Sequence, residues 1–248
     1  MKNKIINLNK IKIEIEALSA ELINMPKGYL NRKGKYYYQT INRKDIGITR
    51  NKPLIQLLCR KKYILARIEQ LQRNLSEPIA LFDDTSPKDI IKTFSKTYHD
   101  VPISYFYHPS MAAWLQEEPD PNPYPINGGY RTTYNKILVR SKSEQITGSL
   151  LEKYGIPYRY ENKLTLGSKY RYPDFLIKNP FTGKEIIWEN FGGPLKPSDK
   201  PKYEKSMLEK MTLYSKQGYV INDTIIFVFE IDINAEHRLE EVIENIIL

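Results

Sequence analysis

The pattern of apolar and polar positions divides the chain into a helical first part and a mixed second part. Apolar residues recur at steps of three and four over residues 3–25 and again over 53–76, which is the spacing of an amphipathic helix. The chain must return between two helices of matching length, so we expect an antiparallel helical hairpin. The few heptads are compatible with three arrangements: a coiled coil, a pair of amphipathic helices packed on the rest of the protein, or a dimer that forms through the apolar stripe.

The segment between these helices, residues 28–51, has turn signals at 33–34 and at 42–45. It predicts a small meander of strands. Basic side chains interleave with tyrosines, a mixture that neutralises phosphates and stacks on bases or sugars. The tyrosines also fit a miniature core beneath a solvated basic face, and the two roles are compatible. The expected nucleic-acid contacts in this segment are Arg32, Lys33, Lys35, Tyr36, Tyr38, Arg43, Lys44 and Arg50.

The second half of the chain alternates between helical and strand-like patterns. Residues 141–154 have the spacing of an amphipathic helix, and Gly155 ends it. The predicted order is α-β-β-β-α-β, followed by another helix. After the first helix, the elements are strands at 158–166, around Asp174 and around Glu189, a helix at 200–217, a strand at 224–230 and a helix at 236–248.

Two acidic residues, Asp174 and Glu189, lie inside short apolar runs with the turn signal 179–183 between them. This pattern predicts a hairpin that carries two carboxylates. Burying a carboxylate among apolar side chains is costly unless it is paired or binds a cation. Carboxylate oxygens are hard ligands that suit Mg²⁺, whereas the His and Cys residues lack zinc-like spacing. Taken singly, each acid also fits an ordinary strand position.

Together, these residues resemble a known family. Glu144 on a helix, then Pro173-Asp174, then Glu189, in this order of elements, is similar to the PD-(D/E)xK nuclease superfamily, over about residues 138–231. The resemblance implies a restriction-endonuclease-like αβββαβ core and metal-dependent hydrolysis of DNA phosphodiester bonds. It also implies that Asp174 and Glu189 bind Mg²⁺ or Mn²⁺, with Glu144 in support. Taken alone, Glu144 also fits an ordinary position in the first turn of a helix, where a negative charge interacts favourably with the helix dipole.

The sequence departs from the family pattern at one position. Phe191 stands where the family carries a lysine, two residues after the second acid. Lys210 and Tyr214, four residues apart on the following predicted helix, share one face and resemble the Gln-x-x-x-Tyr signature of exonuclease members. We therefore expect Lys210 to replace the missing lysine, with Lys205 and Lys163 as alternatives.

The missing lysine leaves two other functions open. The first is a nucleic-acid-binding protein that keeps the nuclease fold without cleaving. The second is a protein that binds a partner, or a second copy of itself, through the N-terminal helices.

Charge is distributed unevenly along the chain. Residues 1–75 contain 17 Lys and Arg against 5 Asp and Glu, about +12, and the remainder contains 21 against 24, about −3, which sums to +9. A basic first part favours nucleic acid, which we expect to be DNA, as the partner. Arg140, before the Glu144 helix, is a further candidate for a phosphate contact and could equally pair with an acid.

These patterns predict three regions: a basic arm at 1–76, a linker or elaboration at 77–137 and a nuclease domain at 138–248. The middle region contains a helix signal at Ser86-Pro87, another at Pro109-Ser110 and a proline-rich loop at 119–125. The single cysteine, Cys59, excludes an internal disulfide. No apolar run reaches membrane-spanning length and the start does not resemble a signal peptide, so we expect a cytoplasmic protein.

Overall fold

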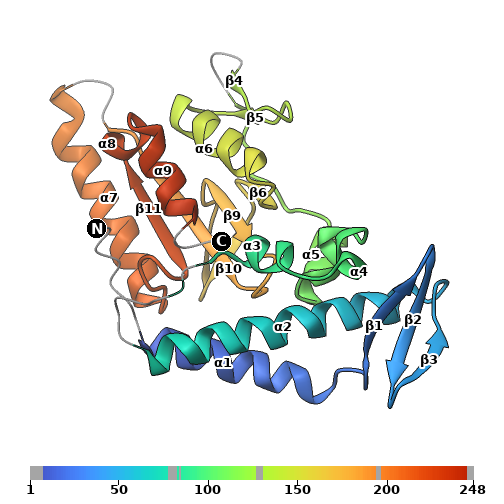
Figure 1. Ribbon diagram of the computed structural model, residues 1–248. Helices are drawn as coiled ribbons and strands as arrows, with labels where there is room; N and C mark the ends of the chain where they lie inside the picture. The colour runs from blue at the N-terminus through green and yellow to red at the C-terminus, as the bar shows by residue number, and fades with distance from the viewer. Residues whose placement is uncertain (1–7, 78–82, 84, 127–130, 194–196, 245–248) are drawn as a thin grey trace. The chain divides into compact units, whose positions relative to one another are not determined.

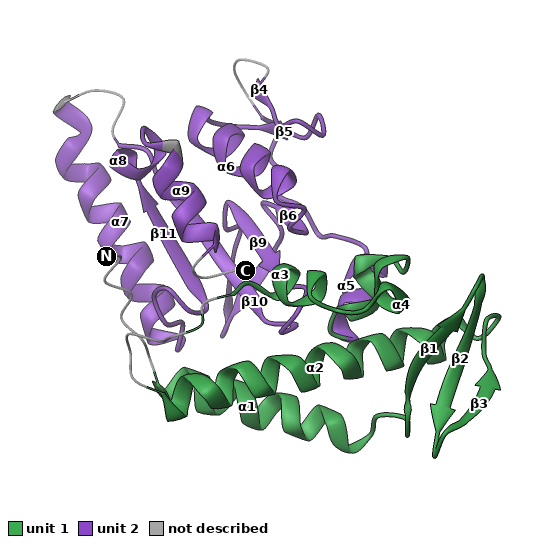
Figure 2. Cartoon of the chain, in the orientation of Figure 1, with its two compact units in different colours: residues 1–108 green, residues 109–248 purple. Residues whose placement is uncertain are grey.

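The computed structural model describes residues 8–77, 83, 85–126, 131–193 and 197–244 (Figure 1). It is a mixed α/β structure with several sheets. The chain divides into two compact units, unit 1 at residues 1–108 and unit 2 at residues 109–248 (Figure 2). The start of the helix expected at 3–25 and the end of the helix expected at 236–248 lie outside the described residues.

Unit 1 contains the two expected helices, α1 (Leu8–Ile23) and α2 (Lys52–Ser76). The side chain of Asn51 accepts the backbone N–H of Leu54 and so begins α2, with Pro53 in the first turn.

Two ion pairs show the direction of the helices. Glu21 of α1 pairs with Arg60 of α2, and Glu14 pairs with Arg67. The later residue of α1 pairs with the earlier residue of α2, so the two helices are antiparallel. Arg60 is only 2% exposed, but its guanidinium donates to both Glu21 oxygens, at 2.9 and 2.7 Å, and to the carbonyl of Phe106 at 3.0 Å. Its buried charge is therefore paired and hydrogen-bonded.

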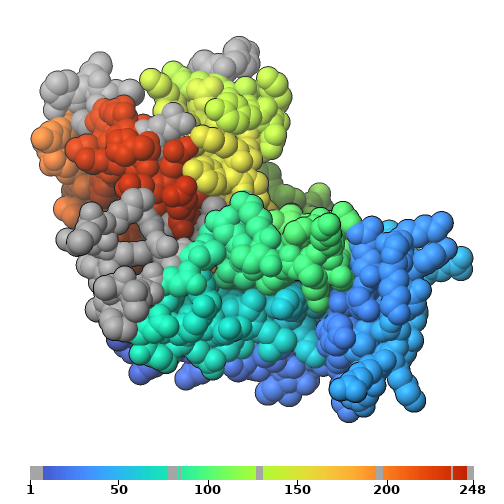
Figure 3. Space-filling model, in the orientation of Figure 1, coloured from blue at the N-terminus to red at the C-terminus, as the bar shows by residue number. Residues whose placement is uncertain are grey.

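Between α1 and α2, the strands β1 (Tyr29–Lys33), β2 (Tyr36–Ile41) and β3 (Lys44–Gly47) form an antiparallel meander in this order. Asn42 and Arg43 both have positive φ, 48° and 65°, as a tight two-residue hairpin turn requires. The atoms of this sheet, coloured blue, stand at one end of unit 1 (Figure 3).

The rest of unit 1 comes from the region that was expected to be a linker or an elaboration. Short helices α3 (Pro87–Lys92), α4 (Lys96–His99) and η2 (Ile103–Phe106) belong to this unit. The rings of Phe94, Tyr98 and Phe106 pack on one another with centroids 5.6 to 6.3 Å apart.

The predicted region at 77–137 is therefore divided, because these buried aromatic residues join its first part to unit 1. Its second part, with α5 (Ser110–Gln116) and the start of the short β4–β5 hairpin, belongs to unit 2. The strands of that hairpin are β4 (Arg131–Thr132) and β5 (Leu138–Val139).

Unit 2 is built on a four-stranded sheet with the order β11-β10-β9-β6. The central strand β10 pairs antiparallel with β9 and parallel with β11, and β9 pairs antiparallel with β6. The strands are β6 (Tyr158–Tyr160), β9 (Phe175–Lys178), β10 (Glu185–Phe191) and β11 (Ile225–Phe229).

The side chains of β10 alternate between the two faces of this sheet. Trp188 packs in a core with residues of the helices α6 (Lys142–Lys153), α8 (Glu230–Ile233) and α9 (Glu236–Val242). Ile187 packs in a second core that includes Tyr214 of helix α7 (Lys200–Lys216). Because neighbouring residues of a strand face opposite sides, α6, α8 and α9 cover one face and α7 covers the other.

A tight turn joins β9 to β10. The backbone N–H of Gly183 donates to the carbonyl of Asn179 at 2.9 Å. The Asn179 side chain accepts the N–H groups of Phe181 and Thr182, each at 2.9 Å. This turn agrees with the signal predicted at 179–183, and it fixes the register of the two strands.

The single strand expected at 158–166 is two separate strands. β6 ends at Tyr160, and Glu161 has a positive φ of 41°. The chain then leaves the main sheet and forms a hairpin from β7 (Leu164–Leu166) and β8 (Lys169–Arg171). The prediction of a single strand was therefore wrong. The alternating sequence pattern continues across the break and does not mark it.

Within the described ranges, no helix combines the length and the apolar character needed to cross a membrane.

Candidate active site

Two carboxylates face each other across β9 and β10. Trp188 lies opposite Phe175 in the strand register, and continuing that register places Glu189 opposite Asp174. Glu189 is fully buried, and Asp174 is half-buried, with most of its surface covered by protein. The backbone N–H of Asn190 donates to Asp174 Oδ2 at 2.6 Å. Asp174 precedes the first residue of β9, so it lies at the strand end and not in mid-strand as predicted.

Helix α7 brings a cation and a hydroxyl to the buried acid. The ammonium of Lys210 donates to Glu189 Oε2 at 2.5 Å, and the hydroxyl of Tyr214 donates to Glu189 Oε1 at 2.6 Å. The two side chains are one helical turn apart, so they share the face that the sequence predicts. Both carboxylate oxygens of Glu189 therefore have a donor.

Phe191 packs on the same face of β10 as Glu189. Its ring lies 5.5 Å from the ring of Phe227 and 5.6 Å from that of Phe229. The Lys210 ammonium lies 5.9 Å from the centre of the Phe191 ring. The cation from α7 thus lies beside the aromatic ring of Phe191.

The two alternative lysines lie elsewhere. Lys163 pairs with Asp120 at 3.3 Å, and Lys205 is exposed on α7. Among these three candidates, the structure gives Lys210 the bond to Glu189.

Burial and charge perturb the groups of this site. Burial, and then the nearby Glu189 carboxylate, raises the pKa of Asp174 well above its usual value. Burial disfavours the charged form of Lys210, but the Glu189 and Asp174 carboxylates outweigh it, so the pKa of Lys210 is raised. Burial and the Glu189 charge also raise the pKa of Tyr214. At neutral pH, Lys210 therefore remains a cation and Tyr214 remains a hydrogen-bond donor.

Glu144 caps its own helix. Its Oε2 accepts the backbone N–H groups of Arg140 at 2.8 Å and Ser141 at 3.2 Å, and the hydroxyl of Tyr160 at 2.7 Å. With Ser141 it forms a capping box at the start of α6. Its charge nevertheless contributes to the raised pKa of Asp174, after burial and Glu189, so it lies within electrostatic range of the acid pair.

Arg140 pairs with an acid, which is one of its two predicted roles. Its Nε lies 2.8 and 3.0 Å from the two oxygens of Glu161. Its other two nitrogens donate to the carbonyls of Pro125 and Tyr124 at 2.9 and 2.6 Å. Each guanidinium nitrogen already has a partner, so the structure does not present Arg140 as a free phosphate contact.

The acid pair suits a magnesium ion in its chemistry. Across the described residues, no group of three or more His, Cys, Asp and Glu side chains is placed to hold a metal ion. The predicted trio of Asp174, Glu189 and Glu144 is therefore not gathered into one ligand set. Mg²⁺, however, is commonly held by one or two carboxylates, with substrate phosphate and water completing the octahedron. Asp174 and Glu189 supply the two carboxylates.

Two further residues, Asn190 and Tyr203, lie beside the site. The Asn190 side-chain oxygen accepts from Thr147 of α6 and from the Trp188 indole, each at 3.0 Å, so it ties β10 to α6. The hydroxyl of Tyr203 accepts the N–H of Gly193 at 3.2 Å. Tyr203 lies seven residues before Lys210, which is two helical turns, so the helical spacing predicts that the two side chains share one face of α7.

The predicted nucleic-acid contacts of unit 1 lie on the β1–β3 sheet and its turns, except Arg50, which follows β3. Lys33 pairs with Asp45 at 2.7 Å and lies 5.7 Å from the ring of Tyr38. Lys35 lies 5.5 Å from the ring of Tyr36. The basic and aromatic side chains therefore interleave in space as well as in sequence.

The other predicted contacts on this sheet differ in their surroundings. Arg32 pairs with Asp100. Arg43, Lys44 and Arg50 are exposed.

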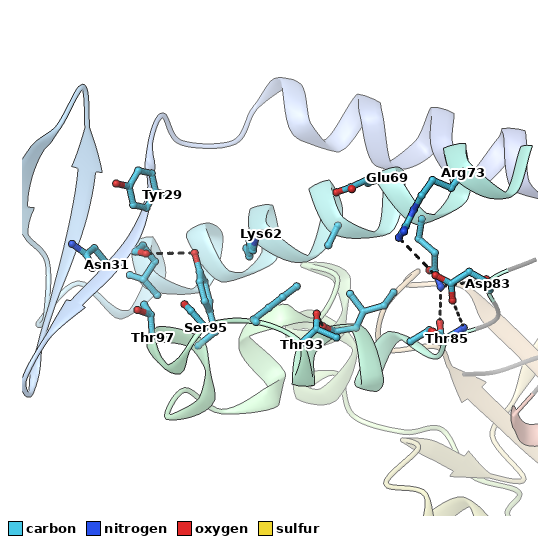
Figure 4. A pocket seen from close by; sticks show the side chains of 16 residues that line it. Tyr29, Asn31, Lys62, Glu69, Arg73, Asp83, Thr85, Thr93, Ser95 and Thr97 are labelled. Atoms are coloured by element: carbon cyan, nitrogen blue, oxygen red, sulfur yellow. Dashed lines mark hydrogen bonds and ion pairs between the residues drawn. The ribbon is translucent and has the colours of Figure 1, made fainter. Parts of the chain in front are cut away.

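A hollow of about 580 Å³ lies in unit 1, between α2, β1 and the segment that carries α3 and α4 (Figure 4). Its lining includes two cations, Lys62 and Arg73, and two acids, Glu69 and Asp83. Arg73 lies 3.7 Å from Asp83. The lining charges cancel, so this hollow lacks the excess positive charge that a phosphate chain would require.

No protein-family model matches the chain, and no curated protein or solved structure matches it significantly.

Proposed function

We propose that the protein is a metal-dependent nuclease that hydrolyses DNA phosphodiester bonds. One observation carries the proposal: Asp174 and Glu189 lie on facing positions of paired strands, and the Lys210 ammonium binds the buried Glu189. Hydrolysis of a phosphodiester requires an activated water and neutralisation of the charge that develops on the phosphate. Two carboxylates that can hold a cation, with a fixed ammonium beside them, fit both requirements.

The order of elements in unit 2 supports a restriction-endonuclease-like core. The elements α6, β6, β9, β10, α7 and β11 follow one another in the predicted α-β-β-β-α-β order, with the β7–β8 hairpin inserted after β6. Asp174 directly precedes the second strand of that series and Glu189 lies on the third, and α7 connects the parallel strands β10 and β11. This arrangement agrees with the resemblance to the PD-(D/E)xK superfamily.

Asp174 and Glu189 would hold Mg²⁺ or Mn²⁺. When bound, the ion would supply a water of lowered pKa and a Lewis acid for the phosphate oxygens. The residues of the chain then have separate roles. Tyr214 orients Glu189 by its hydrogen bond. Lys210 keeps its proton, because its pKa is raised, so it acts as a fixed positive charge for the phosphate and not as a base.

The sheet of unit 1 would add affinity for the nucleic-acid backbone. Exposed cations there attract phosphates regardless of sequence, and Tyr36 and Tyr38 offer ring faces beside Lys35 and Lys33. On this proposal, binding weakens steeply as the salt concentration rises.

Cleavage of a mixed panel tests the proposal. The panel contains supercoiled plasmid, linear duplex, single strand, four-way junction and RNA, each with Mg²⁺, Mn²⁺ or EDTA. We expect cleavage that requires the metal and falls at least about 100-fold in Asp174→Asn and Glu189→Gln, as when one electrostatic stabiliser of a transition state is removed. Glu118→Gln, a change at an exposed acid, is the matched control. Unchanged cleavage in Asp174→Asn would exclude the site.

The packing of Phe191 favours a second candidate function. Its ring is held between Phe227 and Phe229, so the position of the family lysine is filled by an aromatic cluster. In this alternative, the protein binds nucleic acid without cleaving it. Tight binding of the panel, with no cleavage under any metal condition, would identify it.

A partner-binding role rests on a different surface. Ile13 and Ile23 of α1 are exposed, and such residues fit contact with a second protein or a second copy of the chain.

A further inference from the structure

The β7–β8 hairpin of unit 2 presents a second basic and aromatic surface, apart from the β1–β3 sheet of unit 1. Every residue of β8 is exposed: Lys169, Tyr170 and Arg171. Tyr170 is 54% exposed, and its ring packs edge-on against that of Tyr172, with the ring centres 5.7 Å apart. Gly167, with φ of 61°, permits the tight turn that brings β8 back along β7.

The charges of this hairpin are available to a ligand. Neither Lys169 nor Arg171 forms an ion pair with any residue that the structure describes. Lys163, at the base of the hairpin, lies 5.2 Å from the ring of Tyr170 and shares its charge with Asp120 at 3.3 Å. One nitrogen of Arg171 donates to the carbonyl of Tyr170 at 2.9 Å. The surface therefore combines two cations that have no ion-pair partner among the described residues with an exposed tyrosine.

The hairpin is attached directly to the candidate active site. Tyr172 lies two residues before Asp174, a separation of at most about 7 Å along an extended chain. Leu164 and Leu166 of β7 pack in the same core as Tyr214, whose hydroxyl binds Glu189. The hairpin thus lies on the face of the sheet that carries the acids and α7.

We infer that the β7–β8 hairpin binds a single-stranded segment of nucleic acid and leads it to Asp174 and Glu189. Lys169 and Arg171 neutralise two phosphates, and Tyr170 stacks on an unpaired base. Exposed rings beside cations are how proteins bind single strands without sequence preference, whereas a paired base is already stacked and cannot use the ring. The inference rests on the proposed function and narrows its substrate to single strands or unpaired ends.

Binding in EDTA tests the inference separately from cleavage. Labelled single-stranded DNA and a duplex of equal length are titrated with the full-length protein and with Lys169→Glu/Arg171→Glu. We expect the double variant to bind the single strand about tenfold more weakly than the wild type. The slope of log affinity against log salt concentration should be shallower by about 1.4, the value for two lost phosphate contacts.

The β4–β5 hairpin supplies a matched control for this charge reversal. Its exposed Arg131 and Lys136 give Arg131→Glu/Lys136→Glu, a double variant with the same change in net charge. We expect this variant to keep the wild-type affinity and salt dependence. Equal losses from the two double variants would show that net charge sets the affinity, and would overturn the inference.

Tyr170→Ala tests the stacking contact. Loss of one base–aromatic stack should weaken binding of the single strand about 5- to 100-fold and leave the duplex unchanged. Tyr134→Ala removes a similarly exposed ring, 67% exposed, from the β4–β5 region, and should change neither affinity. Equal weakening of single strand and duplex by Tyr170→Ala, or no weakening, would overturn the assignment to single strands.

These measurements and the cleavage assay have independent outcomes. Loss of binding in the hairpin variants, with no cleavage by the wild type, would support this inference and contradict the proposed nuclease. Metal-dependent cleavage with unchanged binding in the hairpin variants would do the reverse.

Discussion

The Lys210 ammonium lies 2.5 Å from Oε2 of Glu189, so a cation on a helix neutralises a fully buried carboxylate on the central strand. This pair is a structural contact as well as a candidate catalytic one. It therefore predicts effects on stability that can be measured before any substrate is known.

Replacing Lys210 should destabilise the protein. Lys210→Met leaves the buried Glu189 charge without its cation, and we expect a loss of about 3 kcal/mol in the free energy of unfolding, the lower end of the range for a broken buried pair, because the lysine is one-third exposed. Urea unfolding measures the loss. Lys205→Met, at the exposed alternative lysine of the same helix, is the control and should cost little.

A double variant distinguishes the charge interaction of Lys210 and Glu189 from a loss of packing. Glu189→Gln/Lys210→Met removes both charges, so the double variant should be more stable than Lys210→Met alone. If the two substitutions had strictly additive effects, the contact would not contribute in the way we describe.

Tyr214→Phe should cost about 1.5 to 3 kcal/mol in the free energy of unfolding, since it removes a hydrogen bond to a buried charged group. The ring remains, so packing is kept. Tyr219→Phe is a matched control, because its ring packs on that of Tyr214 at 5.7 Å without bonding Glu189. Thermal or urea unfolding compares the two, and equal small losses would contradict the role of the Tyr214 hydroxyl.

Divalent cations should stabilise the folded protein. A ligand that binds only the folded state raises its stability by mass action, and we expect Mg²⁺ and Mn²⁺ to raise the Tm of the wild type. The shift should vanish in Asp174→Asn and persist in Glu118→Gln. A shift that survives Asp174→Asn would place the cation elsewhere.

Cys59 should resist thiol reagents while the protein is folded. Burial raises the pKa of this thiol to about 12, whereas the thiol of the unfolded chain has its ordinary pKa of 9.0. The folded thiol therefore stays neutral up to high pH, and stability falls as the pH rises from about 9, because only the unfolded chain then releases the proton.

The rate of labelling by a disulfide reagent at about pH 8 measures this protection. We expect slow labelling in buffer and rapid labelling in denaturing urea. Rapid labelling in buffer would show that α2 opens far more often than its buried position implies.

Much of the secondary structure could be predicted because it depends on local signals. The three- and four-residue spacing of apolar residues marks α1, α2, α6 and α7, and the turn residues around Asn179 mark the hairpin between the acids. The four-residue spacing of Lys210 and Tyr214 was likewise enough to place both on one face of α7, because helical geometry fixes it.

The remainder depends on contacts between distant residues. Nothing in the alternating pattern at 158–166 marks the break at Glu161, where the carboxylate meets Arg140 from before α6. Because Arg140 forms this ion pair with Glu161, it is not a free cation for a phosphate. The first part of the 77–137 region belongs to unit 1. The packing of Phe94, Tyr98 and Phe106 brings together residues from α4, η2 and the segment before α4, which have no periodic pattern.

The length of the turn at Asn179 should be conserved among descendants of this gene, because the site depends on it. A shift of one residue in strand pairing exchanges the two faces of a strand, so it would turn Glu189 toward α6 and bring Trp188 to the side of Lys210. Insertion or deletion of one residue in the turn, ten positions from Glu189, would therefore abolish the site while every residue of the site remained present. Among descendants of this gene, substitutions in that loop should be tolerated far more often than changes in its length.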